Sequence, residues 1–361
     1  MKYIDEFRKK DLVTKLAGLI RKSVTRDYTF MEVCGGHTAA IHRFGIPYLL
    51  PQNVRLISGP GCPVCVTGTD FIDRAIAYSR MEDVIITTYG DLIRVPGSSS
   101  SLEKEKGAGS DVRIVLSALD ALEIARLNPP KKIIFPGIGF ETTAPGTAVT
   151  IKQAEKENIG NFFLLSAHKI MPPAMEAIMK EGVSLDGFIC PGHVAAITGS
   201  SIFNFIPERY NLSCVVTGFE PSDIMQSILM LIKQVNEHTP KVEIEYNRAV
   251  TISGNAMAQM HMSEVFEPCD TRWRGFGVIH LSGLTLRKVY EKYNIENKLP
   301  VIINYQADNE LCICGKILRG LETPDDCPLF AEICFPENPI GACMVSNEGA
   351  CNSWYKYSQV R

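Results

Sequence analysis

The feature that most constrains the fold is a repeated pattern of short apolar runs, each ending in a turn that precedes a helical stretch. Runs of four to six apolar residues alternating with helices are typical of βαβ units and parallel sheets. We therefore predict an α/β protein with two parallel-sheet, Rossmann-like domains, at residues 28–128 and 129–240, that face a cleft. The runs with their turns lie at residues 29–33, 54–58, 83–90, 131–140, 161–169, 186–193 and 212–220.

The two ends of the chain do not follow this pattern. Residues 5–22 carry apolar side chains at helical spacing, which predicts an amphipathic helix. After about residue 240 the alternation fades, and polar, aromatic and cysteine-rich sequence replaces it. We expect residues 1–27 and 241–361 to form a third region, with the N-terminal helix packed against the cysteine-rich end.

Charge and hydropathy exclude two classes of partner. The 37 Lys and Arg against 40 Asp and Glu give a net charge of −3, so no basic excess is present to neutralise phosphates. Residues 1–22 lack an apolar core of signal-peptide length, and no run approaches the roughly 20 apolar residues of a membrane span. We expect a cytoplasmic protein that binds neither nucleic acid nor membrane.

The chain has 12 cysteines, many for a protein of a reducing compartment, where thiols serve as metal ligands or redox groups more often than as disulfide staples. Thiolates hold iron–sulfur clusters and structural zinc. Zinc knuckles usually show two separated CxxC pairs, whereas this tail starts with CxC and continues with wider spacings. We favour an iron–sulfur cluster held by four of six cysteines, over zinc or buried free thiols: Cys312, Cys314, Cys327, Cys334, Cys343 and Cys351.

A second cysteine motif, Cys62-Pro63-Val64-Cys65, follows a predicted strand and precedes a predicted helix. Backbone N–H groups and the dipole at a helix N-terminus favour the thiolate, so this position suits a reactive cysteine pair. Such a pair can cycle between dithiol and disulfide, or bind a metal with outside ligands. Half of a zinc site is the alternative, but no second CxxC accompanies it.

Further candidate residues follow the ends of other predicted strands. Cys34 and His37 lie in a CGGH turn, where two glycines allow close backbone approach, although a buried inert cysteine is an equal alternative. Glu141 and His193 follow later strands. The carboxyl ends of parallel strands form the usual ligand crevice of such sheets, so these candidate catalytic residues could line one cleft.

Taken together and in order, the motifs resemble those of one family, the HypD hydrogenase maturation proteins. The resemblance covers almost the whole chain, and the combination is far more specific than any single CxxC. The matching segments are MEVCGGHT at 31–38, GPGCPVC at 59–65, GFETTAP at 139–145, PGHVAAITG at 191–199, the stretch 272–284 and the cysteine-rich tail.

The resemblance implies a scaffold on which the Fe(CN)2CO unit of [NiFe]-hydrogenase is assembled, together with a HypC-like chaperone that shares the iron and a HypE-like cyanide donor. It implies Cys34 as the iron ligand, His37 as its neighbour, and Cys62 with Cys65 as a redox pair in a central cleft.

The resemblance also implies a [4Fe–4S] cluster in the tail, in surroundings like those of ferredoxin:thioredoxin reductase. Its firmest expected ligands are Cys312, Cys327 and Cys334. Cys343 and Cys351 are rivals for the fourth place, and Cys314 and the unused rival are the two spare thiols.

This function is that of a scaffold with thiol redox activity rather than of a conventional turnover enzyme. Two rival hypotheses remain. One is an iron–sulfur-dependent protein disulfide reductase of the ferredoxin:thioredoxin reductase type. The other is a structural zinc protein that serves as an interaction module.

Overall fold

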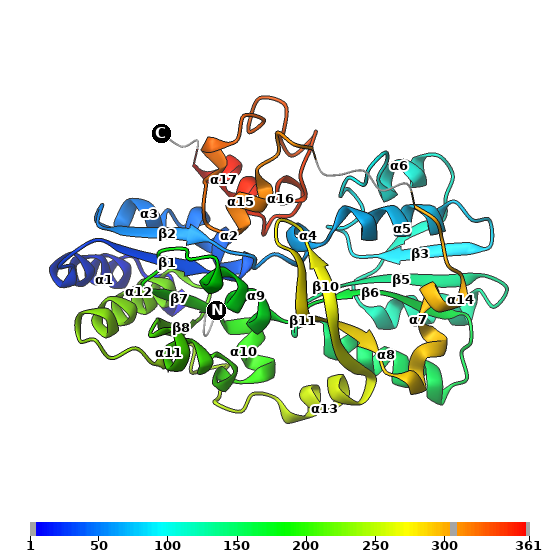
Figure 1. Cartoon of the computed structure of the whole chain (residues 1–361), viewed down its shortest axis with the longest axis horizontal. Coiled ribbons are helices and arrows are strands. Elements are labelled where there is room, and N and C mark those ends of the chain that lie inside the picture. The colour runs from blue at the N-terminus through cyan, green and yellow to red at the C-terminus, as the bar shows by residue number, and fades with distance from the viewer. Residues whose placement is uncertain (1–4, 304–308, 359–361) are drawn as a thin grey trace.

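The computed structural model describes residues 5–303 and 309–358. It contains two parallel sheets and one antiparallel hairpin, with helices between the strands (Figure 1). The predicted α/β class with parallel sheets is confirmed. All seven apolar runs singled out from the sequence are strands.

The larger sheet has five parallel strands in the order β2-β1-β7-β8-β9. The central strands are buried on both faces, which explains why they appear in the sequence as continuous apolar runs. Strand β9 is short and half-buried, and its pattern is too weak to predict. The strands are β1 (Tyr28–Glu32), β2 (Val54–Ser58), β7 (Gly187–Pro191), β8 (Ser213–Thr217) and β9 (Val242–Ile244).

The smaller sheet has four parallel strands in the order β4-β3-β5-β6. Strand β5 pairs with β6 over seven residues and ends beside His168. Strand β4 lies at the edge of the sheet and has only three residues, so the sequence shows no clear strand pattern there. The strands are β3 (Val84–Thr88), β4 (Val112–Ile114), β5 (Lys132–Gly139) and β6 (Phe162–His168).

Helices cover both sheets. Helix α12 packs on β7 and β8, and the N-terminal helix α1 packs on α12. Helix α7 lies against β5, and α5 lies against β3. The helices of the two sheet regions are α1 (Lys10–Ser23), α2 (Gly35–Arg43), α3 (Ile46–Leu49), α4 (Pro63–Val66), α5 (Thr69–Ser79), α6 (Leu102–Gly107), α7 (Ala118–Leu127), α8 (Ala144–Lys156), α9 (Met171–Lys180), α10 (Gly192–Thr198), α11 (Phe205–Tyr210) and α12 (Pro221–Asn236), with short 3-10 turns η1 (Asp5–Phe7) and η2 (Ser200–Phe203).

A long antiparallel hairpin, β10 (Phe266–Trp273) and β11 (Gly277–Leu286), lies between the two sheets (Figure 1). Isolated bridges join it to the loop after the CPVC motif, through Thr67 and Trp273, and to the end of β6, through Lys169 and Gly283. Most of its residues are exposed or half-buried, so its sequence lacks a strong strand pattern. Helix α13 (Ala256–Val265) precedes the hairpin, and η3 (Lys288–Tyr293) and α14 (Ile295–Lys298) follow it.

The cysteine-rich C-terminal segment lies above the junction of the two sheets in Figure 1. Its helix α17 packs on α2, and its helix α16 packs on α4. Short helices joined by turns make up this segment, because Gly, Pro and Asp interrupt every apolar stretch. They are α15 (Cys314–Leu318), η4 (Pro324–Asp326), α16 (Ala342–Val345) and α17 (Ala350–Tyr357).

The sheets do not divide the chain at residue 128, as the sequence suggested. Strands β1 and β2 pair with β7–β9, whereas β3–β6 form the other sheet, so the chain crosses from one sheet to the other and back. The N-terminal helix α1 shares a core with the five-stranded sheet instead of joining the cysteine-rich end. An apolar run reveals that a strand exists, but its partner strand depends on contacts distant in the sequence.

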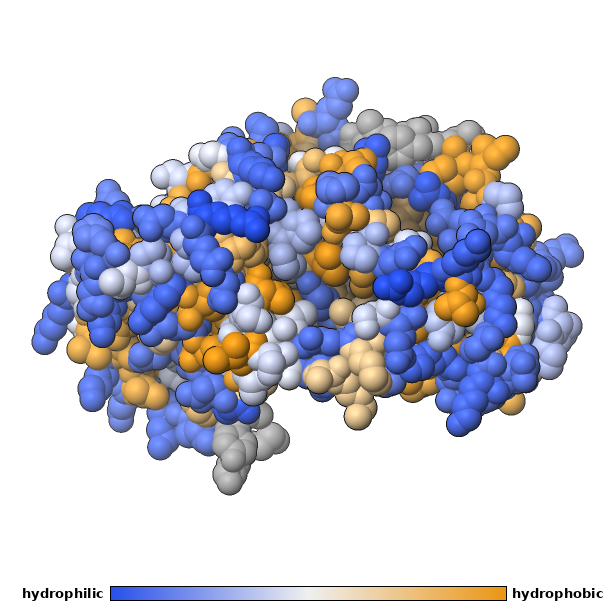
Figure 2. Space-filling view, turned by 60° about the horizontal axis from the view of Figure 1, so that its bottom comes forward, coloured by the Kyte–Doolittle hydropathy of each residue, from blue (hydrophilic) through white to orange (hydrophobic). Residues whose placement is uncertain are grey.

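The surface carries both polar and apolar residues. Figure 2 shows a face that is mostly hydrophilic, with apolar residues in separate groups. Over residues 5–303 and 309–358, no helix combines the length and the apolar character that a bilayer crossing requires.

Candidate functional site

The order of strands in the larger sheet creates a crevice at the carboxyl ends of β1 and β7. Strand β2, which follows β1 in the chain, pairs with one edge of β1. Strand β7, much later in the chain, pairs with the other edge of β1. Open α/β sheets bind ligands at such a reversal of strand order. Cys34 follows β1, Cys62 follows β2, and His193 follows β7. The fold therefore brings three predicted site residues to one edge.

Cys34 is the N-cap residue of helix α2 and is partly exposed. Burial, and next the charge of Glu348, raise the pKa of Cys34 to about 12, while hydrogen bonds from the backbone N–H groups of Gly36 and His37 act in the opposite direction. The helix N-terminus thus offers donors to a charged sulfur. Without a positive partner the thiol stays protonated, whereas a metal cation would displace the proton.

The CGGH and CPVC loops are packed against one another through their backbones. The Gly35 N–H donates to the Gly61 carbonyl at 3.0 Å. A Cβ atom built on Gly61 would lie 2.2 Å from the Cys34 nitrogen and 2.3 Å from its Cα atom. Only glycine allows this approach, so the two motifs form one structural unit.

Cys62 and Cys65 are joined by a disulfide, with their Cα atoms 5.2 Å apart. Cys62 is the N-cap of the short helix α4, and its sulfur accepts a hydrogen bond from the Cys65 N–H at 3.1 Å. Both residues are buried, at 3% and 0% exposure. The predicted position of the pair at a helix start is confirmed, and its sulfur atoms are shielded from solvent.

Two carboxyl groups near Cys34 were not predicted from the sequence. Glu32, the last residue of β1, accepts hydrogen bonds from the Cys34 N–H and the Thr38 hydroxyl, and burial raises its pKa to about 8. Glu348 arrives from the C-terminal segment and packs on Gly35, where an added Cβ atom would lie 2.4 Å from its own. Glu32 lies within the recognised motif, but nothing in the sequence places Glu348 there.

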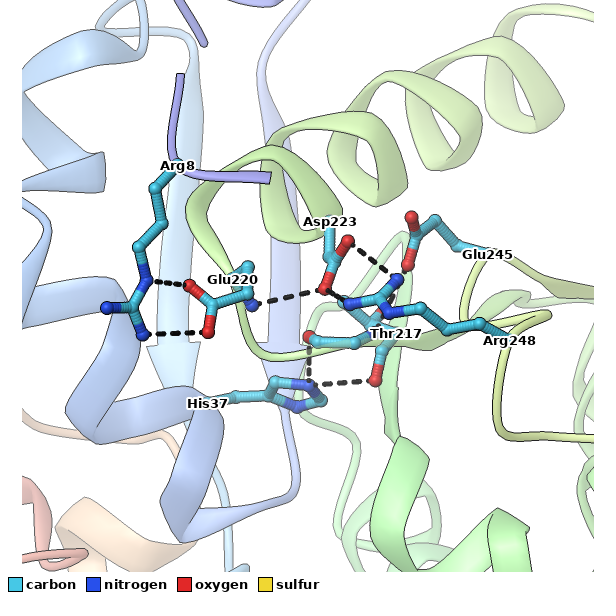
Figure 3. Close-up of polar contacts among 8 residues, drawn as sticks. Arg8, His37, Thr217, Glu220, Asp223, Glu245 and Arg248 are labelled. Carbon is cyan, nitrogen blue, oxygen red and sulfur yellow. Dashed lines mark hydrogen bonds and ion pairs between the residues drawn. The ribbon is translucent and has the colours of Figure 1, made fainter. Parts of the chain in front are cut away.

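An aromatic stack lies beside Cys34. The ring of Phe219 lies between those of His37 and His193, with ring centroids 4.5 Å and 3.8 Å away. The His37 Nε2 atom lies 3.0 Å from the Gly218 oxygen and 3.2 Å from the Thr217 oxygen (Figure 3). Burial lowers the pKa of both histidines, that of His37 to about 4, so both rings are neutral at neutral pH.

Glu141 occupies the corresponding position in the other sheet, after β5. One of its oxygens accepts the Met171 N–H at 2.9 Å, and the other, among the residues that the structure describes, has no hydrogen-bond partner. Burial raises the pKa of Glu141 to about 7. This carboxyl therefore belongs to the end of the four-stranded sheet, while Cys34, His37 and His193 share the edge of the five-stranded sheet.

The tail cysteines converge around Cys314. Its sulfur lies 3.2 Å from that of Cys312. Hydrogen bonds with Cys314 and Cys351 lower the pKa of Cys343. A Cβ atom on Gly341 would lie 2.6 Å and 2.9 Å from the sulfurs of Cys314 and Cys312, so glycine is needed at this position.

Two further tail cysteines lie around this group. The Cys334 sulfur accepts from the Ile340 N–H at 3.4 Å, and burial raises its pKa. The Cys327 sulfur points toward the Leu311 oxygen, 3.9 Å away. In the described ranges, no three His, Cys, Asp or Glu side chains stand together as ligands of one metal ion.

The hairpin contributes a cation that sequence analysis missed. Arg274 is buried and donates to the Thr67 oxygen at 3.2 Å and to the Thr69 hydroxyl at 2.9 Å, just after the CPVC motif. Its positive charge lowers the pKa of Cys343, as a weaker influence than the thiol hydrogen bonds. The tail sulfurs and the Cys62–Cys65 disulfide share one apolar core, in which α16 packs on α4.

Comparison with known proteins gives a consistent family assignment. A family model described as "HypD: Hydrogenase formation hypA family" matches residues 10–358. The chain is 46% identical to hydrogenase maturation factor HypD2 of Bradyrhizobium diazoefficiens, an alignment that covers 100% of this chain and 98% of that protein. It is 44% identical to HypD of Cupriavidus necator, with 100% and 98% covered, and 40% identical to HypD of Escherichia coli, with 99% of each covered.

Proposed function

This chain belongs to the HypD family of hydrogenase maturation factors, and we propose that it acts as a redox-active scaffold on which the Fe(CN)2CO centre of [NiFe]-hydrogenase is assembled. Cys34 holds the iron, which is the cargo of the protein. The Cys62–Cys65 pair provides reducing equivalents beside it. The two parallel sheets act as the walls of the assembly cleft.

The observation that carries this proposal is the backbone contact between the two thiol motifs. Gly35 donates to the Gly61 oxygen, and Gly61 has no room for a side chain beside Cys34. A soft thiolate suits an iron that carries cyanide and carbon monoxide. A dithiol held against that thiolate can act on a group delivered to it, because proximity replaces a diffusional encounter.

The dithiol chemistry balances for a thiocyanate-like cyanide donor. The reduced Cys62 and Cys65 thiols lose two protons and two electrons as their disulfide forms. These two electrons and two protons cleave the S–C bond of the donor. The sulfur side of the donor leaves as a thiol, and its cyanide is released as HCN. The disulfide found between Cys62 and Cys65 corresponds to the oxidised end of this step.

The tail fits an iron–sulfur cluster by its donor set. The thiols of Cys312, Cys343 and Cys351 gather around that of Cys314, and a Cβ atom on Gly341 would intrude on the sulfurs of Cys312 and Cys314. Thiolates are the ligands of [4Fe–4S] clusters, and such a cluster supplies electrons when bound. Four of the six tail cysteines would hold the cluster. Because α16 packs on α4, a cluster held by these cysteines would supply its electrons close to Cys62 and Cys65.

Two partners complete the proposal. A HypC-like chaperone supplies a second thiolate to the iron and carries the finished unit onward. A HypE-like protein delivers cyanide. The partial exposure of Cys34, in contrast with the buried Cys62 and Cys65, supports its role as the sulfur that meets a partner.

Burial of the disulfide also weighs against the alternative, a free-standing reductase of protein disulfides. The attacking thiol of such an enzyme must reach a disulfide on another protein. Cys62 and Cys65 are 3% and 0% exposed, so a bulky protein substrate cannot reach them in this conformation. The cyanide group that a HypE-like protein would deliver needs less space than a protein disulfide.

Infrared spectroscopy of the protein co-purified with its HypC-like partner tests the proposal. We expect bands of iron-bound cyanide and carbon monoxide in the wild type and none in a Cys34→Ala variant. Bands that persist in this variant would exclude Cys34 as the iron ligand. An anaerobic preparation with zinc in place of iron would exclude the cluster.

A further inference from the structure

His37 has one ring nitrogen that is fully engaged and one that is not. Its Nε2 atom faces the carbonyl oxygens of Thr217 and Gly218, at 3.2 Å and 3.0 Å. Carbonyl oxygens only accept hydrogen bonds, so Nε2 carries the ring proton. The Nδ1 atom therefore keeps its lone pair, and within the described residues it has no hydrogen-bond partner although the side chain is completely buried.

A neutral imidazole with this arrangement is a prepared metal ligand. Histidines that bind metals almost always donate their other ring N–H to a backbone carbonyl, a carboxylate or water, which fixes the tautomer and the ring orientation. Imidazole is a common ligand for iron. A buried lone pair without a partner carries a free-energy penalty, which calls for a functional reason.

The position of His37 on helix α2 places it next to Cys34. Cys34 is the N-cap of α2 and His37 is the third residue of the helix, so both lie in its first turn. The His37 N–H donates to the Cys34 oxygen at 2.8 Å, so the first turn is closed between them. The ring of Phe219 covers one face of the imidazole and prevents it from swinging away.

The carbonyl groups that select the tautomer are held by a frame of charged side chains (Figure 3). The Gly218 N–H donates to Glu245 at 3.1 Å. Two residues on, the Glu220 N–H donates to Asp223 at 3.1 Å, and Arg248 binds the same carboxylate at 3.0 Å. The turn at residues 217–220 is therefore fixed from several sides, with Asp223 itself completely buried.

We propose that His37 Nδ1 is a second protein ligand, beside the Cys34 sulfur, for the iron cargo, and that Arg248 and Asp223 are positioning residues that fix the tautomer of His37. The inference rests on the proposed function. On binding, iron(II) displaces the thiol proton of Cys34 to solvent and accepts the lone pair of Nδ1. The imidazole loses no proton, and the oxidation state of the iron does not change.

The tautomer can be measured on the full-length protein labelled with 15N-histidine, purified anaerobically without added iron. The chain has seven histidines, and a His37→Gln variant identifies the His37 signals by their loss. Long-range 1H–15N correlation should show the Nε2–H form alone. A predominant Nδ1–H form would overturn the proposal, because that nitrogen could not then bind a metal.

Iron(II) itself is the probe for the second step. Its addition should shift the His37 ring signals, and His37→Gln should weaken iron binding at the Cys34 site by at least tenfold. A Cys34→Ala variant distinguishes failure of this inference from failure of the proposed function. If Cys34→Ala abolishes this binding while the wild-type His37 signals do not move, the inference fails and the proposed function stands. If binding survives in Cys34→Ala, the proposed function fails.

The frame is tested with Arg248→Lys, which keeps the positive charge but loses the two-point contact with Asp223. We expect a mixture of His37 tautomers and about tenfold weaker iron binding. The matched control is Arg26→Lys, because Arg26 pairs with Asp186 at the start of β7, the opposite end of the same sheet. If the Arg248→Lys protein has the same His37 tautomer and iron affinity as the wild type, Arg248 and Asp223 are not positioning residues.

Discussion

The Cys34 backbone lies against Gly61 so closely that a Cβ atom on the glycine would be 2.2 Å from the Cys34 nitrogen. Two thiol motifs that are 28 residues apart in their first cysteines, Cys34 and Cys62, thus share one backbone contact. The shape of one loop depends on the other. Under the proposed function, chemistry at the disulfide and iron binding at Cys34 are therefore mechanically linked.

Gly61→Ala should disrupt this contact. The added methyl group meets backbone atoms of Cys34 and Val33, which cannot rotate away as a flexible side chain would. We expect a loss of roughly 1–3 kcal/mol in the free energy of unfolding, as for overpacked cores, together with loss of iron bound at Cys34. Urea denaturation and iron analysis measure the two effects.

Gly146→Ala is the matched control, because a Cβ atom at Gly146 meets nothing within 4 Å and the residue lies inside helix α8. This variant should be stabilised by about 0.5–1 kcal/mol. Equal stability of the Gly61→Ala protein and the wild type would show that the two loops can separate.

Glu141 should make stability depend on pH. Burial raises its pKa from 4.5 to about 7, so the folded state favours the protonated carboxyl. Glu141 makes its full contribution to the free energy of unfolding below about pH 4.5. This contribution, roughly 3 kcal/mol, is lost as the pH rises through 7. The unfolding free energy of Glu141→Gln should therefore fall less between pH 5 and pH 8 than that of the wild type.

The exposed Glu332 provides the comparison for this measurement. Glu332→Gln should leave the difference between pH 5 and pH 8 as in the wild type. A Glu141→Gln protein with the full wild-type difference would assign the pH dependence to other buried groups, of which Glu32 is the first candidate.

Cys314→Ser should lower the iron content of the anaerobically purified protein below the about four atoms per chain of a [4Fe–4S] cluster. The reason is the central place of Cys314, whose thiol contacts those of Cys312, Cys343 and Cys351. Cys190→Ala is the control, because Cys190 lies buried in strand β7 of the larger sheet. Full iron in Cys314→Ser would make Cys314 the spare thiol that the sequence suggested.

Cys62→Ser should abolish hydrogenase maturation and leave the absorbance of the cluster unchanged. The variant cannot form the disulfide with Cys65, yet the serine hydroxyl can still accept the N–H that the Cys62 sulfur accepts at the start of α4. Maturation is measured as hydrogenase activity in a cell whose own gene for this maturation factor is deleted. Loss of cluster absorbance in Cys62→Ser would instead make Cys62 a cluster ligand.

Sequence patterns predicted those elements whose signal is local. Buried strands such as β7 and β8 appear as apolar runs because both of their faces are covered. Strands β4 and β9 have three residues each, and the hairpin β10–β11 is largely exposed, so none of them has a recognisable pattern. The missed elements are those at edges and surfaces.

Sequence patterns predicted the thiols of the candidate site but not the residues that surround them. Cys34, Cys62 and Cys65 follow strands, and the turn motifs identify them. Glu348 and Arg274 come from segments more than 200 residues away along the chain, and only folding places Glu348 beside Cys34 and Arg274 against Thr67, just after the CPVC motif. Glu141 shows the reverse case, since a motif marks it but the fold places it in the other sheet.

The sequence by itself determined the α/β class, the strands that end in chemically useful turns, and the family to which the chain belongs. These follow from residue type and spacing along the chain, which need no knowledge of distant contacts. Only the tertiary structure decided which strands share a sheet, that Gly61 touches Cys34, and which nitrogen of His37 is free. Each depends on atoms that are far apart in the sequence, and packing alone selects their neighbours.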